Sequence, residues 1–496
     1  MSWIKSLFHP IPVFPSYCIC IGFADKTVPK IGVPFNYFKN INGHMYIHEE
    51  THKRFSEYLE TRIGEDESYP EQLLEEVYTE SKKLIEITKK ISQDSLKTKS
   101  RLELIMELEE FVEAFKNLTP YLPTINICIA IFETMLRNEL GRRIDNPKLI
   151  DDYILILTSP KNYTVVGDFY DNILKLAIEV NKDEKIKRSL LESHNLTSFE
   201  KFLLKSNSKV FNKIKRITKE FSWMNLDFGF GKFLTFEDTL KRIKWQLRSD
   251  PEMKLKQLRR SKAKRQRKRQ QILNHYLSGK IAKFAEFMNS LVSARQDRFE
   301  AFNIAGARVR SFLEEIATCL GLTFDEISYL TPVEIVDALR DSQPINGRLK
   351  ELVAERKNGY AMVMEKGEIK LYSGKQIELV LEEEVTPLVS EVRGIMIASK
   401  GVNIMGRACI VFNENDFSKV KERDVLIVVA TSPAYTVILD KVVAIVADVG
   451  SITSHTALVV REMGIPCLTK TRFGTRVFHD GDMLEIDAER GIARKL

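Results

Sequence analysis

The sequence has few cysteines, no long apolar run and no N-terminal targeting pattern. Its six cysteines are scattered through apolar surroundings, which indicates reduced core thiols rather than a disulfide framework. The longest apolar stretch, residues 125–132, is too short to span a bilayer and predicts a buried helix. The N-terminus, Met1 to Lys5, lacks the apolar centre of a signal peptide and reaches His9 and Pro10 early. These absences predict a cytoplasmic protein with no membrane association.

Regular periodicity is also scarce in the first 60 residues. Prolines at positions 10, 12, 15, 29 and 34 break up this part of the chain. Cys18 and Cys20 are expected on opposite faces of a strand, and Asn42 to His48 predict another strand. The whole chain of 496 residues is long enough for two or three domains with substantial cores.

No complete nucleotide-binding motif is present. Residues 227–232 read Asp-Phe-Gly-Phe-Gly-Lys, which combines fragments of a kinase motif and of a glycine-rich loop. The lysine spacing of a Walker motif is absent, and no His-Arg-Asp precedes the segment, so it predicts a loop between helices. Arg308 and Arg310 could reach a phosphate, but exposed arginines on a helix are far commoner than phosphate ligands.

Helical periodicity extends from about residue 50 to residue 345. Residues 272–292 and 302–320 are among the predicted helices. Thr331 is expected to cap a further helix that has Pro332 at its first position.

Residues 350–387 change character. Tyr360 to Met364 and Ile369 to Tyr372, separated by a Lys-Gly turn, predict a β-hairpin. Residues 375–385 are expected to follow as an extended connection, so the whole segment is interpreted as a tether.

A basic run dominates the charge of the chain. Residues 254–269 hold ten lysines and arginines and no acid, and without them the formal net charge falls from +7 to −3. Such a run can bind nucleic acid or an anionic surface. However, it contains no aromatic residue and continues into a helical apolar pattern, which favours a solvated helical arm over a nucleic-acid site.

One stretch near the C-terminus carries chemistry. Residues 441–447 form a β-branched run that predicts a buried strand, and Gly450 with Ser451 turns the chain after it. Thr453 or Ser454 can cap a helix that Gly464 and Pro466 close. The free N–H groups and the dipole of its first turn favour an anion. His455 lies in that turn, where a neutral imidazole could accept a phosphoryl group.

The stretch from Asp448 to Pro466 resembles the phosphohistidine motif of the phosphoenolpyruvate-utilising enzymes, such as phosphoenolpyruvate synthase and rifampicin phosphotransferase. Their pattern runs Asp-x-Gly-Gly-x-Thr-Ser-His, a helix, then Arg-Glu-x-Gly-Ile-Pro. Similar segments occur in order at residues 394–406, 424–433 and 479–487. One departure is Ser451 in place of the second glycine, whose hydroxyl is either tolerated or narrows the approach to phosphate.

The resemblance implies an α+β multidomain protein. Its parts are a mainly helical body over residues 1–349 on the acceptor side, a β-hairpin tether over 350–387 and a swivelling β/β/α phosphohistidine domain over 388–496. His455 would carry a phosphoryl group, supported by Gly450, Ser451, Thr453, Ser454 and Arg461. No metal site is expected in this chain.

The same resemblance implies partners. No segment matches the family's ATP-grasp domain or its phosphoenolpyruvate barrel, so the chain is expected to be one component of a phosphotransferase. ATP and Mg²⁺ are expected at a separate ATP-grasp-type subunit, and the acceptor is a small molecule of unknown identity.

Two alternatives stay open. The domain could be an inactive binding or regulatory module, with Ser451 marking lost chemistry. His48-Glu49-x-x-His52 also matches a zinc-peptidase pattern, with Glu75 as a third ligand. That mechanism needs both histidines one turn apart on a helix, whereas the preceding residues predict a strand that would make the helix begin inside the motif.

Overall fold

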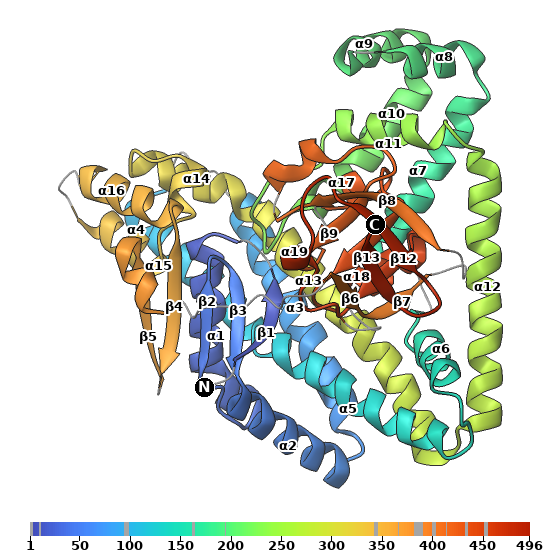
Figure 1. The fold of residues 1–496 in the computed structure, drawn as a ribbon. Coiled ribbons are helices and arrows are strands. Elements are labelled where there is room, and N and C mark those ends of the chain that lie inside the picture. The colour runs from blue at the N-terminus through green and yellow to red at the C-terminus, as the bar shows by residue number, and fades with distance from the viewer. Residues whose placement is uncertain are drawn as a thin grey trace. The chain divides into compact units, whose positions relative to one another are not determined.

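The fold was examined in a computed structural model. It describes residues 3–8, 11–93, 99–160, 164–193, 195–341, 346–365, 367–380, 390–398, 403–412, 414–431, 435–450 and 455–496. The chain separates into two compact units (Figure 1). The first comprises residues 1–135, 227–231 and 290–384, and the second comprises residues 136–226, 232–289 and 385–496. The sequence-based division at residues 349 and 387 stays a prediction.

The first unit combines helices with a five-stranded antiparallel sheet. The strand order is β1-β3-β2-β4-β5, so the predicted hairpin β4–β5 pairs through β4 with the N-terminal strand β2. The strands are β1 (Trp3–Phe8), β2 (Phe38–Ile41), β3 (His44–His48), β4 (Tyr360–Glu365) and β5 (Glu368–Ser373). The helices that lie wholly or partly in this unit are α1 (Val13–Ile31), α2 (Glu49–Glu65), α3 (Tyr69–Gln93), α4 (Arg101–Leu118), α5 (Tyr121–Gly141), α13 (Gly279–Cys319), α14 (Phe324–Ile327), α15 (Pro332–Arg340) and α16 (Asn346–Lys357).

Some expectations for this unit are confirmed. The hairpin forms, β3 ends at His48, and α15 has Thr331 as its N-cap and Pro332 at its first position. Glu334 completes a capping box with Thr331, which satisfies two otherwise unpaired N–H groups.

Other expectations are wrong. Cys18 and Cys20 lie on helix α1 and are both buried, so they are not strand residues. Pro15 falls in the first turn of α1, where its missing N–H costs no hydrogen bond, so it does not prevent the helix. Residues 374–379 form a short 3-10 helix instead of an extended connection. The predicted helix over residues 272–292 is interrupted at Leu277 and Ser278, between α12 and α13.

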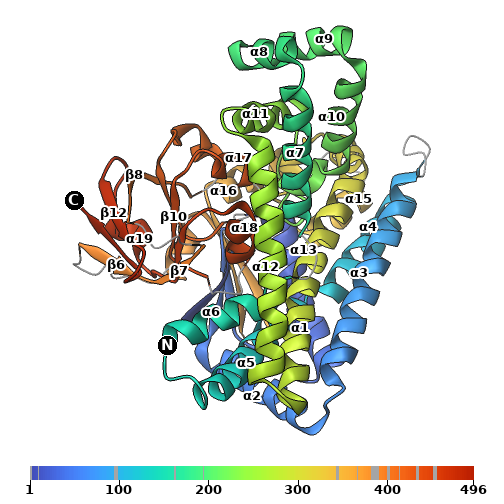
Figure 2. The same cartoon turned by 90° about the vertical axis from the view of Figure 1, so that its right-hand side faces the viewer.

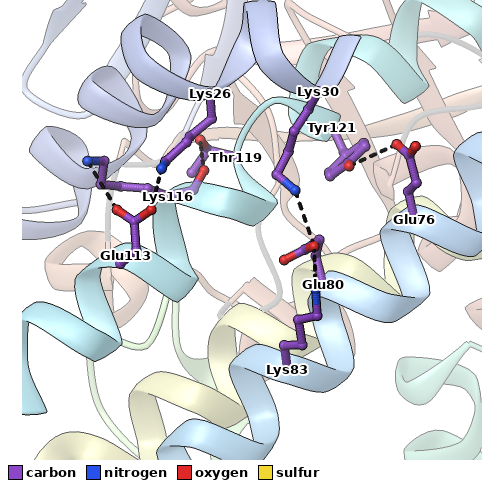
Figure 3. A network of polar contacts seen from close by, with 9 residues as sticks. All are labelled: Lys26, Lys30, Glu76, Glu80, Lys83, Glu113, Lys116, Thr119 and Tyr121. Atoms are coloured by element: carbon purple, nitrogen blue, oxygen red, sulfur yellow. Dashed lines mark hydrogen bonds and ion pairs between the residues drawn. The ribbon is translucent and has the colours of Figure 1, made fainter.

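Charged side chains tie α1 to its neighbours (Figure 3). The carboxylate of Glu80 on α3 is almost buried and lies 3.2 Å from Lys30 of α1 and 3.0 Å from Lys83. One turn earlier on α1, Lys26 pairs with Glu113 of α4. A buried carboxylate is tolerated only with such partners, so these contacts fix how the helices pack.

The segment predicted as a loop, residues 227–232, is confirmed as one. Gly229 donates its N–H to Asn303 Oδ1 at 3.2 Å and packs directly against Gly306 of α13. A Cβ on Gly229 would lie 2.4 Å from the Gly306 Cα. Arg308 and Arg310 bind the carbonyl oxygens of Ile85 and Gly231. The glycine pattern here therefore serves close backbone packing.

The second unit contains helices and the C-terminal sheet. Its helices are α6 (Pro147–Leu157), α7 (Val165–Asn181), α8 (Glu184–Glu192), α9 (Leu196–Ser206), α10 (Ser208–Glu220), α11 (Phe236–Gln246), α12 (Pro251–Tyr276), α17 (Thr436–Leu439), α18 (His455–Met463) and α19 (Gly474–Val477). Its strands are β6 (Glu391–Arg393), β7 (Ile395–Ile397), β8 (Ile404–Ile410), β9 (Val425–Val428), β10 (Ala444–Ala447), β11 (Cys467–Thr469), β12 (Met483–Asp487) and β13 (Ile492–Lys495).

The C-terminal sheet closes on itself. Its order is β6-β13-β12-β8-β9-β10-β11-β7, in which β8 to β11 run parallel and the other pairs are antiparallel. Only Gly394 separates β6 from β7, yet these strands lie at the two ends of the order. The sheet must therefore curl until its edges meet. At that point a Cβ on Gly394 would lie 2.3 Å from the carbonyl oxygen of Thr469.

Alternate residues of the strands line two cores. Val425 and Ile427 pack in the interior of the curled sheet, whereas Leu426 and Val428 face outward into a second core that includes residues of α7 and α18. Both faces are buried, which accounts for the continuous apolar runs of β9 and β10.

The cysteines are free thiols. Five are buried and Cys319 is exposed; burial raises the pKa of Cys128 and of Cys467 to about 12. Among the helices of the described residues, none has the length and apolar content needed to cross a bilayer.

The contact between Gly229 and Gly306 predicts a large stability effect. Gly229→Ala places a methyl group against backbone at a residue with φ of +87°, and should lower the free energy of unfolding by about 2–4 kcal/mol. Urea denaturation of the purified protein measures the change. Gly64→Ala on α2 is the control, since no atom lies within 4 Å of its Cβ position, and it should raise stability by about 0.5–1 kcal/mol. Equal effects of the two substitutions would contradict the packing at Gly229.

Candidate functional site

The predicted strand–turn–helix unit is present. Strand β10 ends at Ala447, Gly450 has φ of +144°, and helix α18 begins at His455. Gly464 has φ of +69° and ends the helix in the left-handed conformation, as its position predicted. Ser451, Thr453 and Ser454 fall outside the described residues, so their roles stay predictions.

The position of α18 follows from parallel strand pairing. The helix connects β10 to the parallel neighbouring strand β11, and Ala457 and Val460 on its inner side are fully buried. His455 therefore lies at the edge where β9 and β10 end. The first N–H groups of the helix have no partner within the helix and favour an anion at this point.

A pair of threonines fixes the start of α18. Thr456, the residue after His455, is buried, and its hydroxyl lies 2.9 Å from that of Thr431, just beyond β9. The Thr456 oxygen also accepts a longer hydrogen bond from the Thr431 N–H at 3.4 Å. This contact holds the first turn of the helix against the end of the adjacent strand. Thr456 was not predicted from the sequence, where its position next to His455 is its one signal.

Asp448 fixes the other side of the turn. Its buried carboxylate accepts hydrogen bonds from the Thr471 hydroxyl at 3.0 Å, and from the N–H at 3.2 Å and the hydroxyl of Thr475. A Cβ on Gly474 would lie 2.9 Å from this carboxylate, so the close approach needs a glycine there. Asp448 therefore anchors the turn that precedes His455 to the start of α19. It opens the motif seen in the sequence, but its role as an anchor was not foreseen.

Arg461, predicted to support phosphate, makes structural contacts in this arrangement. Its guanidinium donates to the carbonyl oxygen of Leu155 at 2.7 Å and to the hydroxyl of Ser159 at 3.2 Å, and its Nε donates to the carbonyl oxygen of Ala457. Leu155 belongs to the last turn of α6, where carbonyl groups lack helical partners and attract a cation. Arg461 therefore joins the histidine helix to α6, and its role toward a phosphate stays a prediction.

Further contacts hold the sheet against the helices of the same unit. Outward residues of β9 and β10 share a hydrophobic core with Phe169 and Ile173 of α7. Asp440, after α17, accepts a hydrogen bond from Gln246 of α11 at 3.1 Å. Burial raises the pKa of this carboxyl group, while the charge of buried Arg242 opposes the shift. The histidine helix is thus docked on a helical surface through apolar and polar contacts.

The zinc-peptidase pattern does not have the geometry that its chemistry needs. His48 is the last residue of β3 and the N-cap of α2, with φ of −64° and ψ of 136°, and its Nδ1 accepts the N–H of Glu50. His52 alone lies within the helix, where burial lowers its pKa. The helix begins inside the motif, as expected. In the described part of the chain, no group of three or more His, Cys, Asp or Glu side chains is placed to hold a metal ion.

Comparison with known proteins identifies relatives of the C-terminal part. Residues 420–491 match the family model described as "PEP-utilising enzyme, mobile domain". The phosphoenolpyruvate synthase of Pyrococcus furiosus is 28% identical over 189 residues, which cover 36% of this chain and 22% of that protein. The probable phosphoenolpyruvate synthase of Archaeoglobus fulgidus is 33% identical over 136 residues, covering 26% of this chain and 18% of the relative.

A further relative is the uncharacterised phosphotransferase YvkC of Bacillus subtilis. It is 37% identical over 94 residues, or 19% of this chain and 11% of its own length. The chain thus spans about a fifth or less of the length of the curated relatives that it matches.

The anchoring role of Asp448 gives a testable prediction. Asp448→Ala removes the acceptor of the half-buried Thr475 hydroxyl and one of the two acceptors of the buried Thr471 hydroxyl, the other being the Ala447 carbonyl oxygen. It should lower the free energy of unfolding by about 1–3 kcal/mol. Asp448→Asn keeps the shape of the side chain and one acceptor oxygen, so it should lower the free energy of unfolding less than Asp448→Ala does. Urea denaturation followed by tryptophan fluorescence measures both. A loss below about 0.5 kcal/mol for Asp448→Ala, the level of an ordinary surface substitution, would contradict the anchor.

Proposed function

Because residues 420–491 match the family model of the mobile domain of phosphoenolpyruvate-utilising enzymes, we propose that this chain is a phosphotransfer protein with His455 as the phosphoryl carrier. The observation that carries the proposal is the position of His455 at the first residue of α18, directly beyond the ends of two parallel strands. There the free N–H groups of the helix face the place where phosphate charge would develop.

The reaction has two displacement steps. A neutral imidazole nitrogen of His455, Nε2 by analogy with the family, attacks the terminal phosphorus of the donor. A P–N bond forms, the P–O bond to the leaving group breaks, and the leaving oxygen takes the electron pair. The oxygen of an acceptor hydroxyl then attacks the same phosphorus and its proton goes to solvent. The P–N bond breaks and its electron pair returns to the nitrogen, which restores neutral histidine. Covalent transfer thus divides one difficult displacement into two easier ones.

Residues around His455 would hold the phosphoryl group. Gly450 leaves room beside the turn because it has no side chain, and the hydroxyl groups of Ser451, Thr453 and Ser454 supply donors. The bond from Thr456 to Thr431 keeps the first turn of α18 in place when the charge arrives. Arg461 neutralises charge only if it leaves its contacts with Leu155 and Ser159.

The donor and acceptor belong to two different sites. We place ATP and Mg²⁺ on a separate ATP-grasp-type subunit, and a small-molecule acceptor at the helical body of this chain. To serve both sites, the C-terminal domain has to separate from α6 and α7, which breaks the contacts of Arg461. The match to a family of mobile domains supports this movement.

Intact-mass spectrometry at alkaline pH tests the proposal, since phosphohistidine is labile in acid. The full chain is incubated with ATP and Mg²⁺ in a lysate of its source cells, beside His455→Ala and His479→Ala. His479 is the matched control because it lies in the same domain and its side chain is 78% exposed. We expect the mass of one phosphoryl group on the unchanged chain and on His479→Ala, and none on His455→Ala.

Two other results would contradict the proposal. A phosphoryl group that persists in His455→Ala would place the chemistry on another residue. No phosphorylation of any of the three proteins, in a lysate that phosphorylates a known carrier of the family, would instead favour an inactive binding module.

A further inference from the structure

Helix α12 has a charge pattern that phosphoryl transfer does not explain. It is a continuous helix from Pro251 to Tyr276, and no acid occurs between Glu252 and Glu286. The basic run of residues 254–269 lies entirely within it. The predicted helix is therefore confirmed.

Four basic side chains form one exposed line along α12. Lys256, Arg260, Lys264 and Arg267 are all exposed. They are spaced by four, four and three residues, so they lie on one side of the helix and follow one another at about 5–6 Å along its axis. We call these four residues the basic stripe. Figure 2 shows α12 running lengthwise.

The opposite side of α12 is anchored. Arg269 is buried, lies 3.0 Å from Glu286 and donates to the carbonyl oxygen of Leu157. Leu255, Ile272 and Leu273 are buried as well. The helix is thus a fixed support that presents the basic stripe outward.

Along the described part of α12, the positive charges of the basic stripe are not paired with acidic side chains one turn away, as two of those on α2 are. Within the described residues, none of its four side chains forms an ion pair. On α2, by contrast, Lys53 pairs with Glu57 and Arg54 with Glu50, each one helical turn away. Like charges at this spacing destabilise a helix, so the fold alone gives no reason for the stripe.

The exposed residues around the basic stripe indicate which kind of anionic partner it can bind. Between residues 256 and 267, the only exposed apolar side chain is Ala263; the other exposed residues are basic or are Gln257, Ser261 and Gln266. A protein interface would need an apolar centre, and a membrane-bound helix would need large apolar residues to insert. Single-stranded nucleic acid would need aromatic side chains for stacking, and none is present. A regular series of phosphates, contacted by basic and amide side chains, needs only what this face offers.

We propose that the basic stripe of α12 binds the phosphate backbone of double-stranded nucleic acid, without regard to base sequence. This inference is independent of the function proposed for His455. It differs from the expectation of a merely solvated arm because the structure shows the charges aligned, exposed and without ion pairs.

Fluorescence anisotropy tests the proposal with the full chain and a labelled DNA duplex of about 25 base pairs, between about 50 and 200 mM salt. Each phosphate contact contributes about −0.9 to the slope of log K against log salt, so the stripe accounts for about −3.6. The variant Lys256→Gln, Arg260→Gln, Lys264→Gln, Arg267→Gln should lose that part of the slope. It should also bind at least tenfold more weakly at the lowest salt concentration.

The matched control removes the same charge elsewhere. Lys53→Gln, Arg54→Gln, Lys82→Gln, Lys241→Gln replaces four exposed side chains that are paired along helices, and should change affinity less than twofold. Circular dichroism confirms the fold of both variants. Three results would overturn the proposal: no binding by the unchanged chain, equal weakening by both variants, or equal competition by polyglutamate. Equal competition by polyglutamate would indicate that the basic stripe binds an acidic protein and not a nucleic acid.

Discussion

Parallel pairing of β9, β10 and β11 is the constraint on which the rest of the site depends. Since both faces of β9 and β10 are buried, the two strands have little freedom to shift in register without exposing apolar side chains. The connection from β10 to β11 must cross one face of the sheet, and α18 makes that crossing with Ala457 and Val460 inward. The first turn of the helix, and His455 with it, is thereby held at the ends of the strands.

Two polar anchors convert this approximate position into a defined one. The Thr431–Thr456 contact joins the end of β9 to the helix, and Asp448 joins the preceding turn to α19. Thr431, Thr456 and Asp448 are buried and Thr475 is half-buried, so water cannot readily replace the hydrogen bonds of either anchor. Arg461 makes a different kind of contact, because it binds α6, which lies outside the sheet domain. The threonine pair and Asp448 therefore position the start of α18, whereas Arg461 holds the sheet domain against α6.

The strand–turn–helix unit around His455 was predicted more accurately than the N-terminal part of the chain. The apolar run of residues 441–447 could only be interpreted as a buried strand, and Gly464 only as a helix end. Both features have strong local sequence signals. The contacts of Arg461, Thr456 and Asp448 had no local signal in the sequence. Their partners Leu155, Thr431 and Thr475 are distant along the chain. Tertiary contacts of this kind cannot be derived from local patterns.

Errors elsewhere have equally specific causes. The residues around Cys18 and Cys20 are apolar on all sides and contain prolines, so periodicity could not distinguish a buried helix from a strand; Pro15 proved compatible with the first helical turn. The break at Leu277 and Ser278 was missed because apolar residues recur at helical spacing on both sides of it. The hairpin at residues 360–372 was recognised, but its pairing with β2 joins segments more than 300 residues apart.

The central claim is that a phosphoryl group resides on a nitrogen of His455. Phosphorus NMR of the loaded protein at alkaline pH tests this most directly, because it distinguishes nitrogen-linked from oxygen-linked phosphate. We predict one nitrogen-linked signal that disappears on acidification and is absent from His455→Ala. An acid-stable, oxygen-linked signal that survives in that variant would place the phosphate on a hydroxyl group and contradict the account.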